Sequence, residues 1–316
     1  MNTLYKYSGM LPLEYFDEPT IKISITGFLN DPFESNASDN ISRSIGNFLE
    51  NIKCSGETVE KGVKTYSRSI NLMLIMNGVI SLSETPRNSL MWAHYAQQHN
   101  GICIGYKNDF LKHIDGESNF QVLINEPVKV NYDNLRFELD YDYKDAHNLD
   151  REAFIQHLLK KSDEWIYEKE HRCIIPFTKA NKFVVLNDQP KIDHIQWHTT
   201  NTRKVFKKGG DFNKVIQMSL EKNSLIETST KNKYLINHDS MSAVRCALLQ
   251  TSKDGMFLID IDKNSIDSVY FGCKVSIDTI KPYFEKLHDK YKLYQFTLSK
   301  KRFELIPQLL NADMFS

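Results

Sequence analysis

Residues 165–176 read WIYEKEHRCIIP, which places two glutamates and an arginine directly before a short β-branched run. Side chains two residues apart in an extended segment point to the same side, so we expect Glu168, Glu170 and Arg172 to line one edge together. Two carboxylates that close together destabilise each other unless a cation or a substrate balances them. The stretch is therefore either an arginine-balanced acidic turn at the start of a strand or part of a catalytic site. On these residues alone, the inert turn is the favoured interpretation.

The composition is that of a globular protein. The chain has 316 residues, of which 41% are hydrophobic and 25% are charged. Forty basic side chains balance forty acidic ones, so the net charge gives no general attraction to nucleic acid or membranes. The five cysteines form no CxxC pair, which indicates reduced thiols. The N-terminus has no apolar signal core and no apolar run reaches about 18 residues, so we expect a cytoplasmic protein that does not span a membrane.

Charge is distributed unevenly along the chain. Residues 179–235 contain eleven Lys or Arg against five Asp or Glu, a net of +6. Residues 136–170 contain ten acidic against six basic side chains. Asymmetry of this kind often marks a surface that binds a partner. The alternative is a solvated lysine-rich insertion.

The apolar pattern predicts many short strands and a few helices in irregular order, which favours an α+β fold. The predicted strands are 4–7, 21–25, 78–83, 102–106, 122–132, 172–177, 256–261, 268–271 and 291–298. The predicted helices are 88–98, 150–165 and 278–288, with a mixed helical region at 35–77 and a short tail at 302–316. Residues 179–254 interrupt this pattern. We therefore expect a core of residues 1–178 with 255–316 and a basic insertion or subdomain at 179–254.

Several common sites find no support in the sequence. No GxGxxG or GxxxxGK[ST] motif indicates a Rossmann site or a P-loop, and no GxSxG elbow indicates a serine hydrolase. His94 has no second histidine four residues further on, so we expect no zinc site and no other metal site. The segment Glu168-Lys169-Glu170 has the residue types of a magnesium-dependent nuclease. Lys169, however, falls on the opposite side of an extended segment, which leaves the nuclease as a weaker alternative.

Several different short motifs stand at intervals along the chain. They are YKY at 5–7, NDPFE at 30–34, SE at 83–84, MWAHY at 91–95 and WxxExEHR at 165–172. Together they resemble a bacterial family that is catalogued only as a domain of unknown function and is common in mobile and phage-defence loci. The resemblance covers about residues 1–178 and 255–300, and the family name implies no activity.

The order of elements also resembles, more distantly, the ADP-ribosyltransferase fold. That resemblance implies a split mixed or antiparallel sheet with flanking helices, with NAD as the substrate. One branch of these enzymes carries an ExE motif, which Glu168 and Glu170 match. Glu170 would stabilise the positive charge that develops on the ribose, and Glu168 would orient or deprotonate the acceptor.

The same resemblance implies a set of NAD-binding residues. They are Tyr5, Lys6, Tyr7, Ser83, Glu84, His94, Tyr95 and Arg172. Lys6 would contact phosphate and Tyr7 would stack on nicotinamide. The first-strand motif differs from that of the ADP-ribosyltransferases, which carry an Arg or a His there.

The implied function is that of a toxin which transfers ADP-ribose from NAD to a macromolecule in phage defence or a toxin–antitoxin system. An antitoxin or a chaperone would be its partner. In the basic segment, Lys204, Lys207, Lys208 and Trp197 suit a single-stranded nucleic acid, RNA included, because cations neutralise phosphates and aromatic rings stack on unpaired bases. A protein acceptor remains open. The alternatives are a catalytically degenerate binding module regulated by a partner, and a metal-dependent nuclease.

Overall fold

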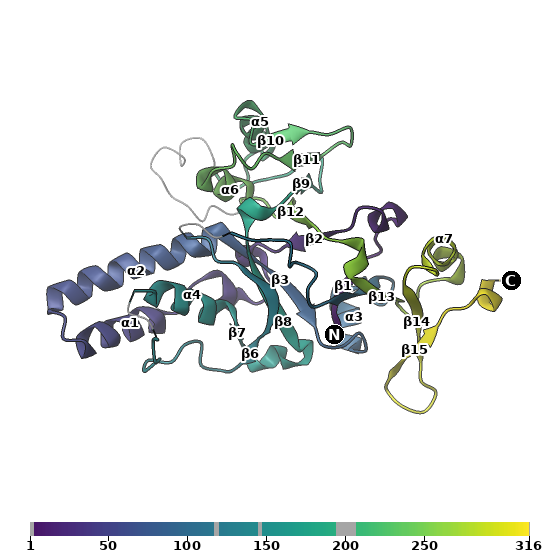
Figure 1. Cartoon of the computed structure of the whole chain (residues 1–316), viewed down its shortest axis with the longest axis horizontal. Coiled ribbons are helices and arrows are strands. Elements are labelled where there is room, and N and C mark those ends of the chain that lie inside the picture. The colour runs from purple at the N-terminus through teal and green to yellow at the C-terminus, as the bar shows by residue number, and fades with distance from the viewer. Residues whose placement is uncertain (1–2, 117–119, 145–146, 194–206, 316) are drawn as a thin grey trace.

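The computed structural model describes residues 3–116, 120–144, 147–193 and 207–315, and it confirms a mixed α+β fold built on a large curled sheet (Figure 1). Eight strands form this sheet, and all neighbours are antiparallel except β13 and β14, which are joined through helix α7. In spatial order the strands are β15 (Leu305–Leu309), β14 (Lys292–Leu298), β13 (Ile266–Phe271), β4 (Ile102–Lys107), β1 (Thr3–Ser8), β3 (Asn77–Ser83), β8 (Glu170–Pro176) and β5 (Ile124–Lys129).

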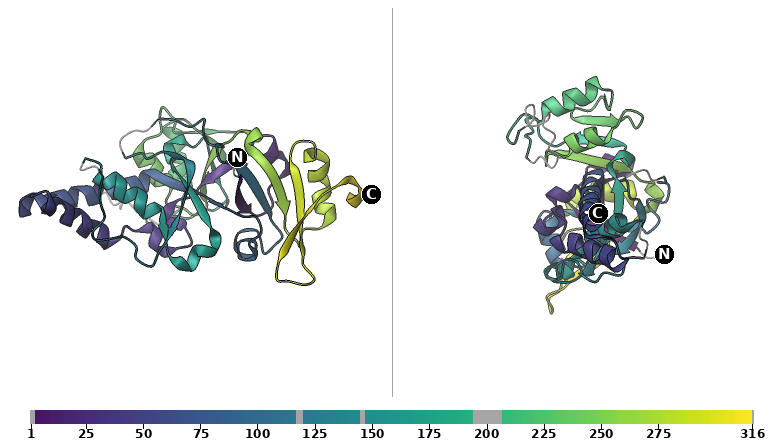
Figure 2. Two further views of the ribbon diagram at one scale, coloured as in Figure 1. Left: turned by 60° about the horizontal axis from the view of Figure 1, so that its bottom comes forward. Right: turned by 90° about the vertical axis from the view of Figure 1, so that its left-hand side faces the viewer.

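A second sheet of five strands lies against the first. Its order is β10 (Leu225–Glu227), β11 (Lys233–Ile236), β9 (Lys182–Val185), β12 (Gly255–Asp260) and β2 (Thr20–Ile23). Segment 179–254 supplies β9, β10 and β11, together with helices α5 (Asn213–Glu221) and α6 (Ala243–Leu249). Its strands thus share one sheet with β2 and β12, and Figure 2 shows this part (in green) stacked beside the large sheet.

The remaining helices cover the large sheet. They are α1 (Asp39–Asn51), α2 (Gly56–Met76), α3 (Ser89–Tyr95), α4 (Leu149–Leu158) and α7 (Ile277–Leu287). Figure 1 shows α1, α2 and α4 gathered at one end of the sheet and α7 at the other. None of the helices in the described ranges is both long and apolar enough to cross a bilayer.

The alternation of side chains along β8 separates two cores. Cys173 and Ile175 belong to the main apolar cluster, which also contains strands of the five-stranded sheet. Ile174 points to the other face and joins a cluster formed by α1, α2 and α4. Because Glu170 and Arg172 follow the same alternation as Ile174, they lie on the helix-covered face.

The large sheet opens between β1 and β3. β1 pairs with β4 over six residues and β3 pairs with β8 over seven, but within the described residues β1 and β3 share one backbone pair, Tyr5 with Ser83. Further along, Ser24 and Val79 exchange two backbone hydrogen bonds of 2.8 and 3.0 Å. The edge of β3 between these two points therefore faces a gap rather than a neighbouring strand.

Three predicted elements differ from the structure. The helix predicted at 150–165 ends at Leu158, after which Lys160–Lys161 form β7 beside β6 (Asn131–Tyr132) and Asp163–Glu168 form a 3-10 helix, η4. The Ser162 hydroxyl accepts the Glu164 N–H at 3.4 Å and so starts a new turn. The helix predicted at 88–98 is shorter (α3) because Gln97, Gln98 and His99 have positive φ. The predicted tail contains strand β15.

The contact between β2 and β3 depends on a glycine at position 78. A Cβ there would lie 2.5 Å from the Ser24 carbonyl oxygen and 2.6 Å from the Phe177 ring. We predict that Gly78→Ala lowers the free energy of unfolding by about 2 kcal/mol, because backbone must move to admit the methyl group. The control Gly56→Ala places its Cβ in open space at the start of α2 and should not destabilise the chain. Urea unfolding of the two variants measures the difference, and equal stability would remove the close approach as a constraint.

Candidate active site

Glu168 and Glu170 share a buried cation. The Lys161 ammonium donates to Glu168 Oε2 at 2.6 Å and to Glu170 Oε2 at 3.2 Å. All three residues are less than a tenth exposed. The Lys161 ammonium also lies 4.8 Å from the centroid of the Trp165 ring. The cation that two neighbouring carboxylates require therefore comes from β7.

Arg172 fixes the second carboxylate from within its own strand. Its Nε donates to Glu170 Oε1 at 2.7 Å and its Nη2 to Glu170 Oε2 at 3.0 Å. Nη1 donates to the Leu158 carbonyl oxygen at 2.7 Å, and Nη2 also donates to Glu34. The guanidinium is fully buried, so each bond offsets part of a large desolvation cost. The prediction that Glu170 and Arg172 share a face is confirmed.

Glu168 reaches the cluster by a different route from the one predicted. It is the last residue of η4, and Lys169 adopts a left-handed conformation with φ 48° and ψ 52°. The prediction of one extended segment through Glu168 is therefore wrong. The tight turn nevertheless brings its carboxylate to Lys161, beside Glu170.

A tyrosine and a serine complete the setting of Glu168. The Tyr95 hydroxyl donates to Glu168 Oε1 at 2.5 Å, and Asn30 Nδ2 donates to that hydroxyl at 3.0 Å. The Ser83 hydroxyl donates to the Glu168 carbonyl oxygen at 2.7 Å. Helix α3 is set to present Tyr95, because Asn88 caps its start and the buried Trp92 donates from Nε1 to the Pro86 carbonyl oxygen at 2.7 Å.

The NDPFE motif supplies the third carboxylate. Asp31 Oδ1 accepts the Phe33 N–H at 2.9 Å and starts a short 3-10 helix with Pro32 in its first turn. This turn buries Glu34, which is 4% exposed, against Arg172. The cluster therefore holds three carboxylates and two cations.

Burial and ion pairing act in opposite directions on these groups. Burial alone would raise the pKa of Glu170, but the charges of Arg172 and Lys161 outweigh it and lower this pKa to about 2. Burial raises the pKa of Glu34, and Arg172 offsets only part of that shift. Burial would lower the pKa of Lys161, yet the carboxylates around it, Glu170 first, raise it. Glu170 is therefore ionised at neutral pH.

The carboxylate cluster forms one wall of a cavity of about 640 Å³. The cavity lies at the gap between β1 and β3, where the Lys6 ammonium donates to the Ser81 carbonyl oxygen on the unpaired edge of β3 at 2.9 Å. Burial, helped by Lys22, lowers the pKa of Lys6 to about 8. Met256 and Leu258 of the five-stranded sheet also line the cavity.

Eight of the ten residues predicted for catalysis and NAD binding line this cavity. They are Tyr5, Lys6, Tyr7, Ser83, Tyr95, Glu168, Glu170 and Arg172. Two lie outside it. Glu84 pairs with Lys129 at 2.9 Å, and the exposed His94 ring packs 6.4 Å from the Tyr167 ring.

The predicted nucleic-acid contacts lie in the basic segment. Lys207 and Lys208 are exposed just before α5, and Trp197 and Lys204 lie outside the described residues.

Sequence reasoning missed Lys161 and the role of Glu34. Lys161 was hidden in the predicted helix 150–165, and its spacing from Glu168 has no recognisable motif. Glu34 was part of a quoted motif, but no local pattern in the sequence signals its burial against Arg172. Among the described residues, no three His, Cys, Asp or Glu side chains are placed to share a metal ion.

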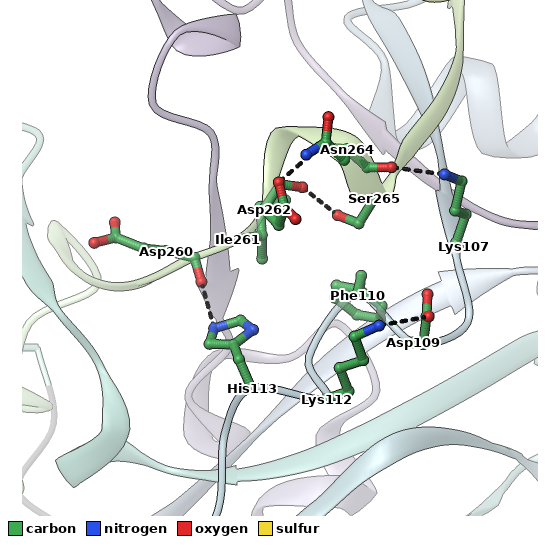
Figure 3. Close-up of a pocket in the computed structure, with 10 residues that line it drawn as sticks. All are labelled: Lys107, Asp109, Phe110, Lys112, His113, Asp260, Ile261, Asp262, Asn264 and Ser265. Carbon is green, nitrogen blue, oxygen red and sulfur yellow. Dashed lines mark hydrogen bonds and ion pairs between the residues drawn. The ribbon is translucent and has the colours of Figure 1, made fainter.

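A second cavity of about 500 Å³ lies between the end of β4 and the end of β12 (Figure 3). Its polar side chains bond to one another and to nearby backbone: Lys107 donates to the Asn264 carbonyl oxygen at 2.7 Å and Lys112 pairs with Asp109 at 3.3 Å. His113 Nε2 lies 3.1 Å from the Asp260 carbonyl oxygen. None of the predicted site residues lines this cavity, and we assign it no role.

The ionised state of Glu170 makes stability depend on pH. A carboxylate whose pKa falls from about 4.5 to about 2 on folding adds stability above pH 4.5, and this is lost as the pH falls from 4.5 to 2. We predict that Glu170→Gln costs on the order of 3 kcal/mol at pH 7 and that its difference from the unchanged chain shrinks between pH 4.5 and 3. Urea unfolding at several pH values measures this.

The control for the pH series is the exposed pair between Glu57 and Lys61. Glu57→Gln should change stability by less than about 0.5 kcal/mol at every pH. A Glu170→Gln difference that stays constant down to pH 3 would contradict the ion-pair account.

The comparisons with known proteins gave a match to one part of the chain. Residues 91–173 match the model of a family described as "Protein of unknown function (DUF2971)". The matched residues include Tyr95, Lys161, both glutamates of the ExE motif and Arg172. Neither the curated proteins nor the solved structures gave a match to the chain. The expectation that the chain carries a domain of unknown function is thus confirmed for residues 91–173.

Proposed function

We propose that the cavity between β1 and β3 binds NAD and that the chain transfers ADP-ribose from NAD to a macromolecule. The observation that carries the proposal is a pair of buried carboxylates, Glu168 and Glu170, held by Lys161 at the wall of a cavity of about 640 Å³. That volume is within the roughly 300–1,000 Å³ range of sites for small molecules and cofactors.

The lining of the cavity suits the parts of NAD. Tyr5, Tyr7 and Tyr95 provide aromatic surface for the nicotinamide ring. Lys6 provides a cation for the diphosphate. The ionised Glu170 provides negative charge where the ribose becomes positive.

The chemistry follows from these charges. The bond between ribose C1′ and the nicotinamide nitrogen breaks, and nicotinamide leaves with the bonding electron pair. The resulting oxocarbenium-like ribose is stabilised by the Glu170 carboxylate, which Arg172 and Lys161 already hold in place. A nucleophile of the acceptor forms a new bond to C1′, and its proton passes to Glu168 or to water.

Two alternatives rest on the same cluster. In the first, the intramolecular bonds of Glu170 to Arg172 and Lys161 are purely structural, and the chain is a binding module regulated by a partner protein. It would then bind NAD without consuming it, or would not bind it. In the second, the chain is a metal-dependent nuclease. This is the weaker candidate, because the ion would have to displace Lys161 and Arg172 from the carboxylate oxygens.

The biological setting extends the proposal. The resemblance to a family common in phage-defence loci supports a toxin role, with an antitoxin or chaperone protein as the partner. The acceptor is a nucleic acid, RNA included, or a protein.

We predict that Glu170→Gln lowers the rate of nicotinamide release from NAD by roughly two or more orders of magnitude, because about 3 kcal/mol of charge stabilisation is lost. The rate is measured with labelled NAD on protein shown to be folded by its unfolding curve. The control Glu164→Gln removes the same charge from an exposed position of η4 and should keep the full rate. Full activity of Glu170→Gln would rule out its proposed role.

A separate prediction concerns the acceptor. The adjacent exposed lysines Lys207 and Lys208 should bind phosphates if the acceptor is single-stranded nucleic acid. We predict that changing both to Glu weakens RNA or DNA binding and makes its salt dependence shallower, while NAD binding persists. The matched control changes Lys300 and Lys301, an equally exposed adjacent pair on the loop between β14 and β15. Equal effects of the two pairs, or none, would favour a protein acceptor.

A further inference from the structure

Two lysines of the cavity have no carboxylate partner. Lys6 on β1 donates to the neutral Ser81 carbonyl oxygen, and neither it nor Lys22 on β2 forms an ion pair within the described residues. Burial and then the charge of Lys22 lower the pKa of Lys6, and burial lowers the pKa of Lys22. Because like charges repel, an anion that binds at both ammonium groups would favour the protonated form of each.

The carboxylate wall differs in its charge balance. There, the ion pairs that Glu34, Glu168 and Glu170 form within the described residues are with Lys161 and Arg172. The cavity therefore has a carboxylate end, where the cations Lys161 and Arg172 are already paired. It also has a positive part, formed by Lys6 and Lys22, without a paired carboxylate among the described residues.

The register of the strands gives the order of these groups. Arg172 is paired with Ser81 across β8 and β3, and Lys6 bonds to Ser81 across the gap. The charge of Lys22 acts on Lys6, and Lys22 is paired with Leu258 across β2 and β12. The spatial order of the groups that line the cavity is thus the carboxylates, then Lys6 and Lys22, and then the apolar side chains of Leu258 and Met256.

We propose that Lys6 and Lys22 form a subsite for the diphosphate group of a nucleotide. A ligand that places a sugar at the carboxylates, a diphosphate at the lysines and a base against Leu258 and Met256 matches the order of the groups. The identity of the ligand as an ADP-ribosyl compound rests on the proposed function, whereas the anion subsite rests on the two lysines alone.

The test is calorimetric binding of ADP-ribose, adenosine and inorganic pyrophosphate to the full chain. The Lys22 side chain is exposed, so Lys22→Gln should fold. We expect this variant to lower the affinity for ADP-ribose and for pyrophosphate by about tenfold, which is the effect of losing one charge-assisted contact. The affinity for adenosine should not change. Lys22→Arg should retain most of the affinity. The control Lys231→Gln removes an exposed lysine beside the same sheet and should have no effect.

The pH dependence of binding gives a readout that a structural role would not change. The groups around the Lys6 ammonium are Lys22, Glu168, Glu170, Arg172 and the thiol of Cys173. Because the pKa of Lys6 is about 8 and an anion favours its protonated form, ADP-ribose affinity should fall as the pH rises through 8. In Lys22→Gln the fall should move to higher pH, since a repelling charge is gone. If the affinity for ADP-ribose did not change between pH 7 and 9, Lys6 would not be part of the subsite.

The outcomes separate this subsite from the transferase. If NAD is consumed but Lys22→Gln binds ADP-ribose as tightly as the unchanged chain, the proposal of the subsite is wrong and the proposal of the transferase is supported. If pyrophosphate binding depends on Lys22 and NAD is never consumed, the subsite stands and the transferase is wrong. If the unchanged chain binds neither ADP-ribose nor pyrophosphate, the subsite is wrong.

Discussion

The Lys161 ammonium between Glu168 and Glu170 is the interaction on which the rest of the site depends. Without it, the two buried carboxylates would repel each other with no cation shared between them. Arg172, whose charge lowers the pKa of Glu170 more than that of Lys161 does, adds two bonds, and the two cations together keep Glu170 ionised. The same cluster joins segments that are far apart in sequence, because Glu34 reaches it from a 3-10 helix and Lys161 from β7. Replacing any one member leaves its partners charged and buried, which is costly.

The gap between β1 and β3 is the second constraint. A continuous sheet would bury the edge of β3 under the backbone of β1, and no cavity could form there. Instead, β1 holds β3 at Tyr5 and the residue after β2 holds it at Val79, so the sheet stays joined while its middle opens. Lys6 supplies the donor that a neighbouring strand would have given to the Ser81 carbonyl. The cavity is thus a consequence of strand pairing and not of a mobile loop.

Much of this arrangement was predictable from local pattern, and the rest was not. The strands at 78–83 and 102–106 and the shared face of Glu170 and Arg172 follow from the two-residue period of extended chain. Lys161 was not predictable, because helical propensity hid the break after Leu158 and nothing local pairs it with a glutamate seven residues on. The partnership of Glu34 with Arg172 depends on contact across 138 positions, which periodicity cannot reveal. Local rules therefore found Glu168, Glu170 and Arg172, but neither Lys161 nor the contact of Glu34 with Arg172.

The hydrogen bonds that Glu170 accepts from Arg172 and Lys161 determine how the cluster could act on a ligand. A carboxylate that must turn or lose water during a reaction gives up part of its stabilising effect to that reorganisation. Glu170 is already dehydrated, ionised and fixed by Arg172 and Lys161, so its field at the cavity is present before any ligand arrives. The cations reduce that field, and Glu168, which accepts the Tyr95 hydroxyl, adds its own charge at the same wall. A positive centre that develops on a bound sugar at this wall would meet both carboxylates at once. In the proposed reaction the positive charge of the nicotinamide ring passes to the ribose as the bond between them breaks. The geometry therefore suits charge that moves onto a bound sugar, because the carboxylates that meet it are already in place.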